Sequence, residues 1–232
     1  TVTTQGLCSN ASLSGTITVN PDSTINLSLG AGTDNQTKCI NTAITPIKYT
    51  ISNGGTNPTI SWNPGPASFT GSYDTAAGVY TITGSSAIAG NYNYTITTAG
   101  TCINSSLSGT ITVNPNPTGS ANAQTVCSGS VTNVALNPTV TGTTFTWTAV
   151  ILNTPTAGTI TGFGSGSGAS IAQVLTNTGT SAGTIRYTVT PTANSCPGSA
   201  FTVDVTVNPK PTGSAIAQTV CSGSSTNVAL NS

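Results

Sequence analysis

Histidine, glutamate and methionine are absent from this sequence of 232 residues, and charged residues make up only 3% of it. An ordinary soluble domain has roughly 25% charged residues. The four acids are all aspartates, Asp22, Asp34, Asp74 and Asp204. Because histidine and glutamate supply much of the acid–base and metal-ligand chemistry of enzymes, we expect a chain that is not an enzyme and that binds no cofactor or metal.

Positive charge is equally scarce. Three lysines and one arginine balance the four aspartates, so the formal net charge is +0. Nucleic-acid binding needs a basic face for the phosphate backbone, and four cations are too few to build one. The sequence has no run of about 18 apolar residues, so we expect no membrane insertion by this segment. The missing methionine indicates a processed chain or a window of a longer protein.

What is abundant favours β-structure. Threonine, valine and isoleucine suit strands, while 26 glycines and 13 prolines, with many asparagines and serines, suit turns. Apolar residues alternate with polar ones, and no segment of useful length has helical periodicity. The predicted inward faces are Ile47, Tyr49 and Ile51; Tyr92, Tyr94 and Ile96; Phe145, Trp147 and Ala149; Ile185, Tyr187 and Val189; and Phe201, Val203, Val205 and Val207.

The sequence repeats with a period near 94 residues. Residues 117–138 and 211–232 are identical at 19 of 22 positions, and residues 8–21 and 102–115 at 12 of 14, both at an offset of 94. About seven short strands fit into one period. This pattern predicts an all-β array of tandem Ig-like (PKD-like) β-sandwich domains.

A Val-Asn-Pro sequence marks each repeat end, at residues 19–21, 113–115 and 207–209. Proline cannot continue a central strand ladder and holds the preceding residue extended, so we expect short, stiff Asn-Pro junctions. The predicted pieces are the last strand of a preceding repeat (1–20), an Ig-like repeat (21–114), a PKD-like or Ig-like repeat (115–209) and the first strands of a following repeat (210–232).

Six cysteines recur at regular spacing: Cys8, Cys39, Cys102, Cys127, Cys196 and Cys221. Without histidine or a Cys-x-x-Cys pair they do not resemble a zinc site, and they indicate disulfides in an exported protein.

Two pairing schemes fit the cysteines. The favoured one closes each whole repeat, Cys39 with Cys102 and Cys127 with Cys196, and leaves Cys8 and Cys221 to neighbouring repeats. Each such loop would contribute on the order of 4 kcal/mol in the chain-entropy model. The rival scheme bridges the junctions, Cys8 with Cys39, Cys102 with Cys127, and Cys196 with Cys221.

Several segments resemble a known family. TVCSG, TNVAL, TTFTWT, LTNTGTSAGTIRYTVTPTANSC and VTVNPKPTG resemble the PKD-like and Ig-like repeats of giant cell-surface adhesins of Bacteroidota. KCINTAITPIKYTI and GVYTITGSSAIAGNYNYTITTAGTC resemble Ig repeats interleaved with them. Among such adhesins, the segments resemble the flavobacterial gliding-motility adhesin family (SprB-like). In the first repeat, residues 62–66 (WNPGP) depart from the Leu-Pro-x-Gly usual there.

The resemblance implies export by type IX secretion, a bacterial cell-surface location, and attachment to surfaces or polysaccharide through parts outside this sequence. It also implies O-glycosylation, because Asp22-Ser23-Thr24 and Asp74-Thr75-Ala76 match the sequon of Bacteroidota. Ser23 and Thr75 are therefore candidate acceptors.

Other candidate sites are few. Asp22 and Asp34 are the one pair of carboxylates near a junction, and we interpret them as exposed turn residues rather than as calcium ligands. Trp147 lies on an inward face and is expected in the core. Trp62, in a predicted loop among asparagine and proline, is the candidate sugar contact. A carbohydrate-binding module would need an exposed aromatic platform, for which Trp62 and Tyr73 are the candidates.

The functional hypothesis is a stiff, disulfide-stapled spacer in the stalk of a long surface adhesin, whose contacts are neighbouring repeats of the same chain. One alternative is a subunit of a self-assembling extracellular filament, built by strand pairing between incomplete repeats with lateral contacts between copies. Exposed edge strands normally carry charges that prevent such pairing, and this chain has few. A second alternative is a carbohydrate-binding module.

Overall fold

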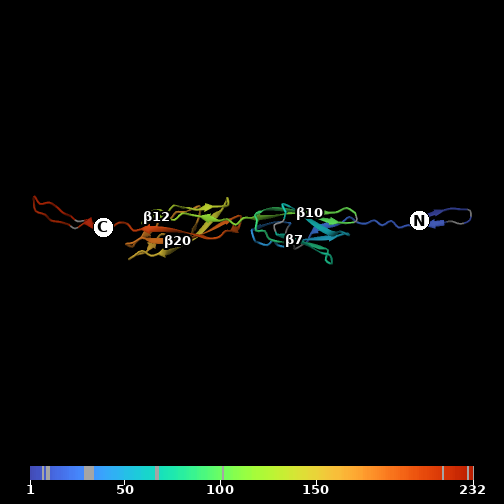
Figure 1. Cartoon of the computed structure of the whole chain (residues 1–232), viewed down its shortest axis with the longest axis horizontal. Helices are drawn as coiled ribbons and strands as arrows, with labels where there is room; N and C mark the ends of the chain where they lie inside the picture. The colour runs from blue at the N-terminus through green and yellow to red at the C-terminus, as the bar shows by residue number, and fades with distance from the viewer. Residues whose placement is uncertain are drawn as a thin grey trace. The chain divides into compact units, whose positions relative to one another are not determined.

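A computed structural model describes residues 1–6, 8, 11–28, 34–65, 68–100, 102–215, 217–228 and 230–231. The regular elements of these residues are all β-strands, and none of them forms a helix able to cross a bilayer. The chain divides into two compact units, Thr1–Asn114 and Pro115–Ser232 (Figure 1).

The first unit is a sandwich of two four-stranded sheets. One sheet contains, in spatial order, β3 (Thr24–Leu27), β5 (Ile47–Ser52), β8 (Val79–Gly84) and β7 (Phe69–Asp74). The other contains β4 (Asn35–Cys39), β10 (Ser106–Asn114), β9 (Gly90–Ala99) and β6 (Thr56–Asn63). Neighbouring strands are antiparallel except β4, which runs parallel to β10.

Alternating residues of both sheets fill the core between them. Ile47, Tyr49 and Ile51 of β5 are buried, and their neighbours along the strand are exposed. The same alternation buries Tyr92, Tyr94 and Ile96 of β9. Successive side chains of a strand point to opposite faces, so the faces predicted from the sequence for this unit are confirmed.

Two buried phenols give this core a polar centre. The hydroxyl of Tyr49 lies 2.9 Å from that of Tyr94, which donates to the backbone oxygen of Asp34 at 2.9 Å. Burial, with the hydrogen bond to Tyr49, raises the pKa of Tyr94. A side chain at Gly109 would collide with the Tyr94 hydroxyl and the Asp34 carbonyl, so glycine is required where β10 crosses this pair.

The second unit has one large sheet, facing shorter paired segments. Its spatial order is β12 (Gln124–Cys127), β22 (Phe201–Asn208), β20 (Gly183–Ala193), β15 (Thr144–Asn153) and β17 (Gly166–Ser167), with β21 (Cys196–Pro197) also on β20. The short pairs are β11 (Gly119–Ser120) with β14 (Asn137–Pro138), β13 (Val134–Ala135) with β18 (Ser170–Ile171), and β16 (Ile160–Thr161) with β19 (Thr176–Asn177). β12 runs parallel to β22, as β4 does to β10.

The core of the second unit follows the predicted alternation. Phe145 and Trp147 of β15 are buried and Ala149 is half-buried, while β20 contributes Ile185, Tyr187 and Val189. Val203, Val205 and Val207 come from β22. Trp147 is 7% exposed, which confirms its predicted place in the core.

Short hairpins lie at both termini, β1 (Val2–Thr4) with β2 (Ala11–Leu13), and β23 (Ser214–Ala215) with β24 (Leu230–Asn231). Residues 1–20 thus hold two paired strands, not the single strand expected. Val2 pairs with Leu13 just as Ile96 pairs with Leu107, 94 residues later. The register of the repeat is therefore kept in these partial segments.

One ion pair joins neighbouring strands of the second unit. Arg186 of β20 and Asp204 of β22 are register partners, and both guanidinium–carboxylate contacts are 2.8 Å. The hydrogen bonds from Arg186 lower the pKa of Asp204. The pair is partly exposed, so salt screens it and its contribution to stability is small.

We expect the melting temperature to stay within a few degrees between pH 5 and 8 and to change little with salt. The lowered pKa of Asp204 gives stability that is lost only as the pH falls below its ordinary value of 3.8. Burial raises the pKa values of Tyr94 and Tyr187, that of Tyr187 to about 12. The stability that these neutral phenols contribute to the folded protein is therefore lost only as the pH rises above 10. Calorimetry across pH 3–11 checks this. In the control Asp204→Asn, only the fall of the melting temperature at acidic pH should become smaller.

Candidate functional site at the ends of the units

We define the leading end of a unit as the end where the chain comes into its sandwich, and the trailing end as the end where the chain leaves it. The trailing end of the first unit is Asn114, the last residue of β10. Cys39 of β4 is its register partner, and the Ile40 amide donates to the Asn114 carbonyl at 3.0 Å. Cys39 therefore lies at the trailing end.

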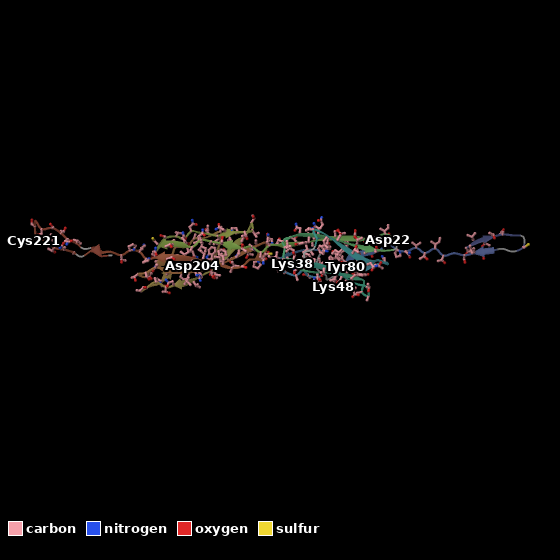
Figure 2. The ribbon with its side chains drawn as sticks, in the orientation of Figure 1. Asp22, Lys38, Lys48, Tyr80, Asp204 and Cys221 are labelled. Atoms are coloured by element: carbon pink, nitrogen blue, oxygen red, sulfur yellow. The ribbon has the colours of Figure 1, made fainter. Side chains whose placement is uncertain are left out.

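The leading end of the first unit carries the other cysteine. The Cys102 thiol donates to the Asn20 carbonyl at 3.3 Å, and the Ile103 amide donates to the Asp22 carboxylate at 3.2 Å. Figure 2 labels Lys38, beside Cys39, and Asp22, and places them at opposite ends of this unit. Cys39 and Cys102 are thus separated by the length of the sandwich.

The second unit has the same arrangement. Cys127 of β12 is the register partner of Asn208, and the Ser128 amide donates to the Asn208 carbonyl at 2.9 Å. Cys196 of β21 is at the other end, because Gly198 packs so closely on Pro117 that a side chain would collide with the Pro117 carbonyl. Cys127 lies at the trailing end and Cys196 at the leading end.

Neither cysteine pairing predicted from the sequence is formed. Cys39 and Cys196 are disulfide-bonded, whereas Cys8, Cys102, Cys127 and Cys221 are free and exposed. For the pairing within repeats, the physical reason is distance. β10 alone spans about 26 Å between the two cysteine ends of the first unit, whereas a disulfide needs Cα atoms within about 7 Å.

The same geometry separates the cysteines of the second unit. Cys196 pairs with Ala193 and Gly183 pairs with Val207, so ten residues of β20, about 33 Å, lie between the two ends. The sequence predicts that cysteines form disulfides, but it does not predict at which end of the sandwich each cysteine lies.

Ser23, a candidate acceptor of O-linked sugar, is buried. Its hydroxyl lies 2.6 Å from the Thr98 hydroxyl, donates to the Ile103 carbonyl at 3.0 Å and accepts from the Ser105 amide at 3.2 Å. Folding leaves this oxygen no room for a glycan, so the expectation for Ser23 is wrong for the folded unit. Ser23 instead ties the incoming chain to the turn that carries Cys102.

Thr75, the second candidate acceptor, is exposed at the tip between β7 and β8. The Asp74 carboxylate accepts from the amides of Ala76 and Ala77 at 2.9 and 3.1 Å, which fixes the turn. Glycosylation at Thr75 stays a prediction.

Trp62 lies in strand β6, not in the loop expected from the sequence. Its ring stacks on Phe69 at 5.6 Å and contacts Tyr94 at 5.3 Å, and Tyr73 also packs against this core. The alternation of Ile60 and Trp62 was the signal for a strand, but the Asn-Pro-Gly run directly after it moved the expected boundary. The half-buried ring offers less surface to a sugar than a loop tryptophan would.

Asn177 is a buried residue of the trailing end that sequence reasoning did not identify. Its side-chain nitrogen donates to the carbonyls of Val207 and Ser181 at 2.8 and 2.9 Å, and its oxygen accepts from the Gly179 amide at 2.8 Å. The Ser128 hydroxyl accepts from the backbone amide of Asn177 and donates to its carbonyl. An asparagine followed by threonine and glycine is typical of an ordinary turn, so nothing in the sequence indicates that Asn177 is buried.

The structure thus defines a class of protein: a tandem array of Ig-like β-sandwiches, in which each whole unit carries one cysteine at its leading end and one at its trailing end. A family model described as a PKD-like domain matches residues 124–211, within the second unit. No curated protein matches the chain.

Solved structures with similar folds are distant in sequence. The IG1+IG2 structure of DIP-gamma is 15% identical, with a TM-score of 0.48, over 82% of this chain and 99% of that one. Titin I67–I69 is 10% identical, with a TM-score of 0.48, over 82% of this chain and 67% of that one. The Yersinia pseudotuberculosis adhesin InvE is 16% identical, with a TM-score of 0.31, over 80% and 58%.

Proposed function

We propose that this chain is a non-enzymatic stalk segment of a long bacterial cell-surface adhesin, which acts as a stiff spacer. The observation that carries the proposal is that the chain enters each sandwich at one end and leaves it at the other, at Asn20–Asp22 and Asn114 in the first unit. Each added repeat then adds its strand length to the reach of the protein.

Strand arrangement supports a mechanical role. In each unit a strand near the start of the repeat runs parallel to its last strand, β4 with β10 and β12 with β22. Pulling the two chain ends apart slides these partners along each other, so several backbone hydrogen bonds must break together. Such a ladder resists tension better than one whose bonds open in succession.

Chemistry and resemblance support the location. Disulfide-bonded cysteines such as Cys39 and Cys196 are typical of oxidising, extracellular environments. The resemblance to the SprB-like gliding adhesins of Bacteroidota extends the proposal to type IX secretion, the bacterial surface, and attachment to surfaces or polysaccharide through other parts of the protein.

Small-angle X-ray scattering, with electron microscopy of the same sample, tests the spacer role. A compact chain of 232 residues has a radius of gyration of about 17 Å. We expect about twice that value and single, thin, unbranched rods with beads a few tens of Å apart. A radius near the compact value would overturn the spacer, and thick fibres of paired chains would replace it by the self-assembling filament.

A further inference from the structure

We propose that the outer edge of β15, in the second unit, is a pairing surface for a second copy of this chain. The open part of this edge is residues 148–152, and we name it the β15 edge. Two copies align these segments antiparallel, so that their large sheets become one continuous sheet. This inference goes beyond the spacer role and does not depend on the adhesin assignment.

The β15 edge is open because its neighbour on that side is short. On one side β15 pairs with β20 along most of its length, from Thr144 to Asn153. On the other side β17 covers only Thr146 and Trp147. Among the described residues no further strand pairs with β15, so residues 148–152 have a strand on one side only.

The backbone groups of two residues point out of this edge. The Phe145 carbonyl accepts from the Gly168 amide at 3.1 Å, which places the backbone groups of Phe145 on the side away from β20. Backbone groups of an extended strand alternate between its two sides, so those of Ala149 and Ile151 point the same way. The register of β15 with β20 becomes irregular only after Ile151. The two residues therefore offer two amides and two carbonyls to an added strand.

The β15 edge also lacks the devices that normally prevent strand pairing. Charges, prolines and bulges protect most exposed edges. In the first unit, the edge strand β6 contains Pro58 and a shift of register, and the edge strand β4 contains Lys38. β15 contains neither charge nor proline. Its open segment is thus the kind of edge that attracts another strand.

The exposed side chains of this edge are apolar. Val150 and Leu152 are 57% and 49% exposed. The nearest charge on the same face is Arg186, the register partner of Val150. Its guanidinium is bound by Asp204 of β22, one strand farther from the edge. An added strand therefore covers apolar surface and leaves the ion pair intact.

A second copy fits because the edge is symmetric about Val150. With a two-fold axis at this residue, Ala149 faces Ile151 of the second copy, and Ile151 faces its Ala149. Both pairs can exchange backbone hydrogen bonds. Val150 faces Val150 of the second copy in a pair without backbone hydrogen bonds, where side chains come closest. Such an interface is the same on both sides and closes on itself, so it yields pairs of chains and not open fibres.

One contact of this kind is weak, and several together are strong. A few residues of strand bury much less than the roughly 1,200 Å² of a stable interface, so the chain stays single in dilute solution. Residues 211–232 repeat residues 117–138 and so begin a further unit of the second type. An array with several such units presents several β15 edges, and each later contact forms within a pair that is already joined.

Disulfide trapping tests the pairing at its axis. Val150→Cys brings two thiols together across the two-fold axis, at the Cα spacing that a disulfide needs. Thr148→Cys is the matched control, because it lies on the same exposed face of the strand but meets Leu152 of the second copy. The background removes the free, exposed cysteines by four substitutions, Cys8→Ser, Cys102→Ser, Cys127→Ser and Cys221→Ser.

Both variants are oxidised with oxidised glutathione at a series of protein concentrations, and the dimers are measured by electrophoresis without reductant. We expect Val150→Cys to give a several-fold higher yield of dimer than Thr148→Cys. Equal yields would show that the thiols meet by random collision. Equal yields, or no dimer from either variant, overturn the proposal.

Hydrogen exchange supplies a second readout on the chain without an added cysteine. Exchange of the Ala149 and Ile151 amides should become slower as the protein concentration rises. Val150→Lys places two like charges at the axis and should abolish this slowing. Amides protected equally at every concentration would show that a segment of the same chain covers the edge, and amides that are never protected would show an edge without an occupant. Either result overturns pairing with a second copy.

Discussion

Replacing Trp147 by alanine is expected to destabilise the second unit by roughly 3–5 kcal/mol. The side chain lies in the middle of β15, 7% exposed, opposite Val189 of β20. Gly166 of β17 packs flat on the indole ring, where any side chain would collide with it. Alanine therefore leaves a cavity that the strand backbones on both sides cannot fill. Urea unfolding of the second unit measures the loss.

Two variants separate the causes of this loss. Within the described residues the buried indole N–H of Trp147 has no hydrogen-bond acceptor, so Trp147→Phe removes an unpaired donor with only part of the volume and should cost much less than alanine. Trp62→Ala, at a half-buried ring, should cost less and should affect only the first unit. Equal losses for Trp147→Ala and Trp62→Ala would contradict the difference in burial.

Trp147 and Trp62 show where sequence reasoning works in this protein. In a strand that is buried on one face, every second residue is apolar, so Phe145 and Trp147 could be assigned to the core without a structure. Trp62 obeys the same alternation, but its strand ends at Asn63, and Asn63 with the Pro64 that follows also favours a turn. Boundaries depend on which local signal prevails, and that is decided by the register with β9.

The cysteines and Ser23 show what the sequence could not supply. Spacing indicates that the cysteines form disulfides. The end of the sandwich at which each cysteine lies, however, depends on β4 and β12 running parallel to the last strand of their unit. A bond between Cys39 and Cys102 would give the first whole repeat one disulfide of its own, but the length of its strands keeps the two cysteines too far apart. A motif at Ser23 likewise carries no information on burial, which only the turn around Cys102 reveals.

Asn177→Asp is expected to destabilise the second unit by several kcal/mol at pH 7, with most of the loss recovered near pH 3. The change removes the two N–H groups that satisfy the Val207 and Ser181 carbonyls, and a buried unsatisfied group costs about 1–3 kcal/mol. The new carboxylate would face these carbonyl oxygens in a buried site, so its pKa in the folded state rises. Stability is then present below the unfolded value of about 3.9 and is lost as the pH rises.

Urea unfolding at each pH gives the difference in free energy of unfolding between the variant and the wild type. The wild type must be measured as well, because protonation of Asp204 also lowers its stability in acid. Asn177→Ala should lose stability at every pH, and Asn133→Asp, at an exposed site of the same unit, should lose little. A pH-independent loss in Asn177→Asp would show that the side chain is not buried against carbonyls. Because Val207 directly precedes Asn208, the register partner of Cys127, a weakened Asn177 should also loosen the trailing end of the second unit.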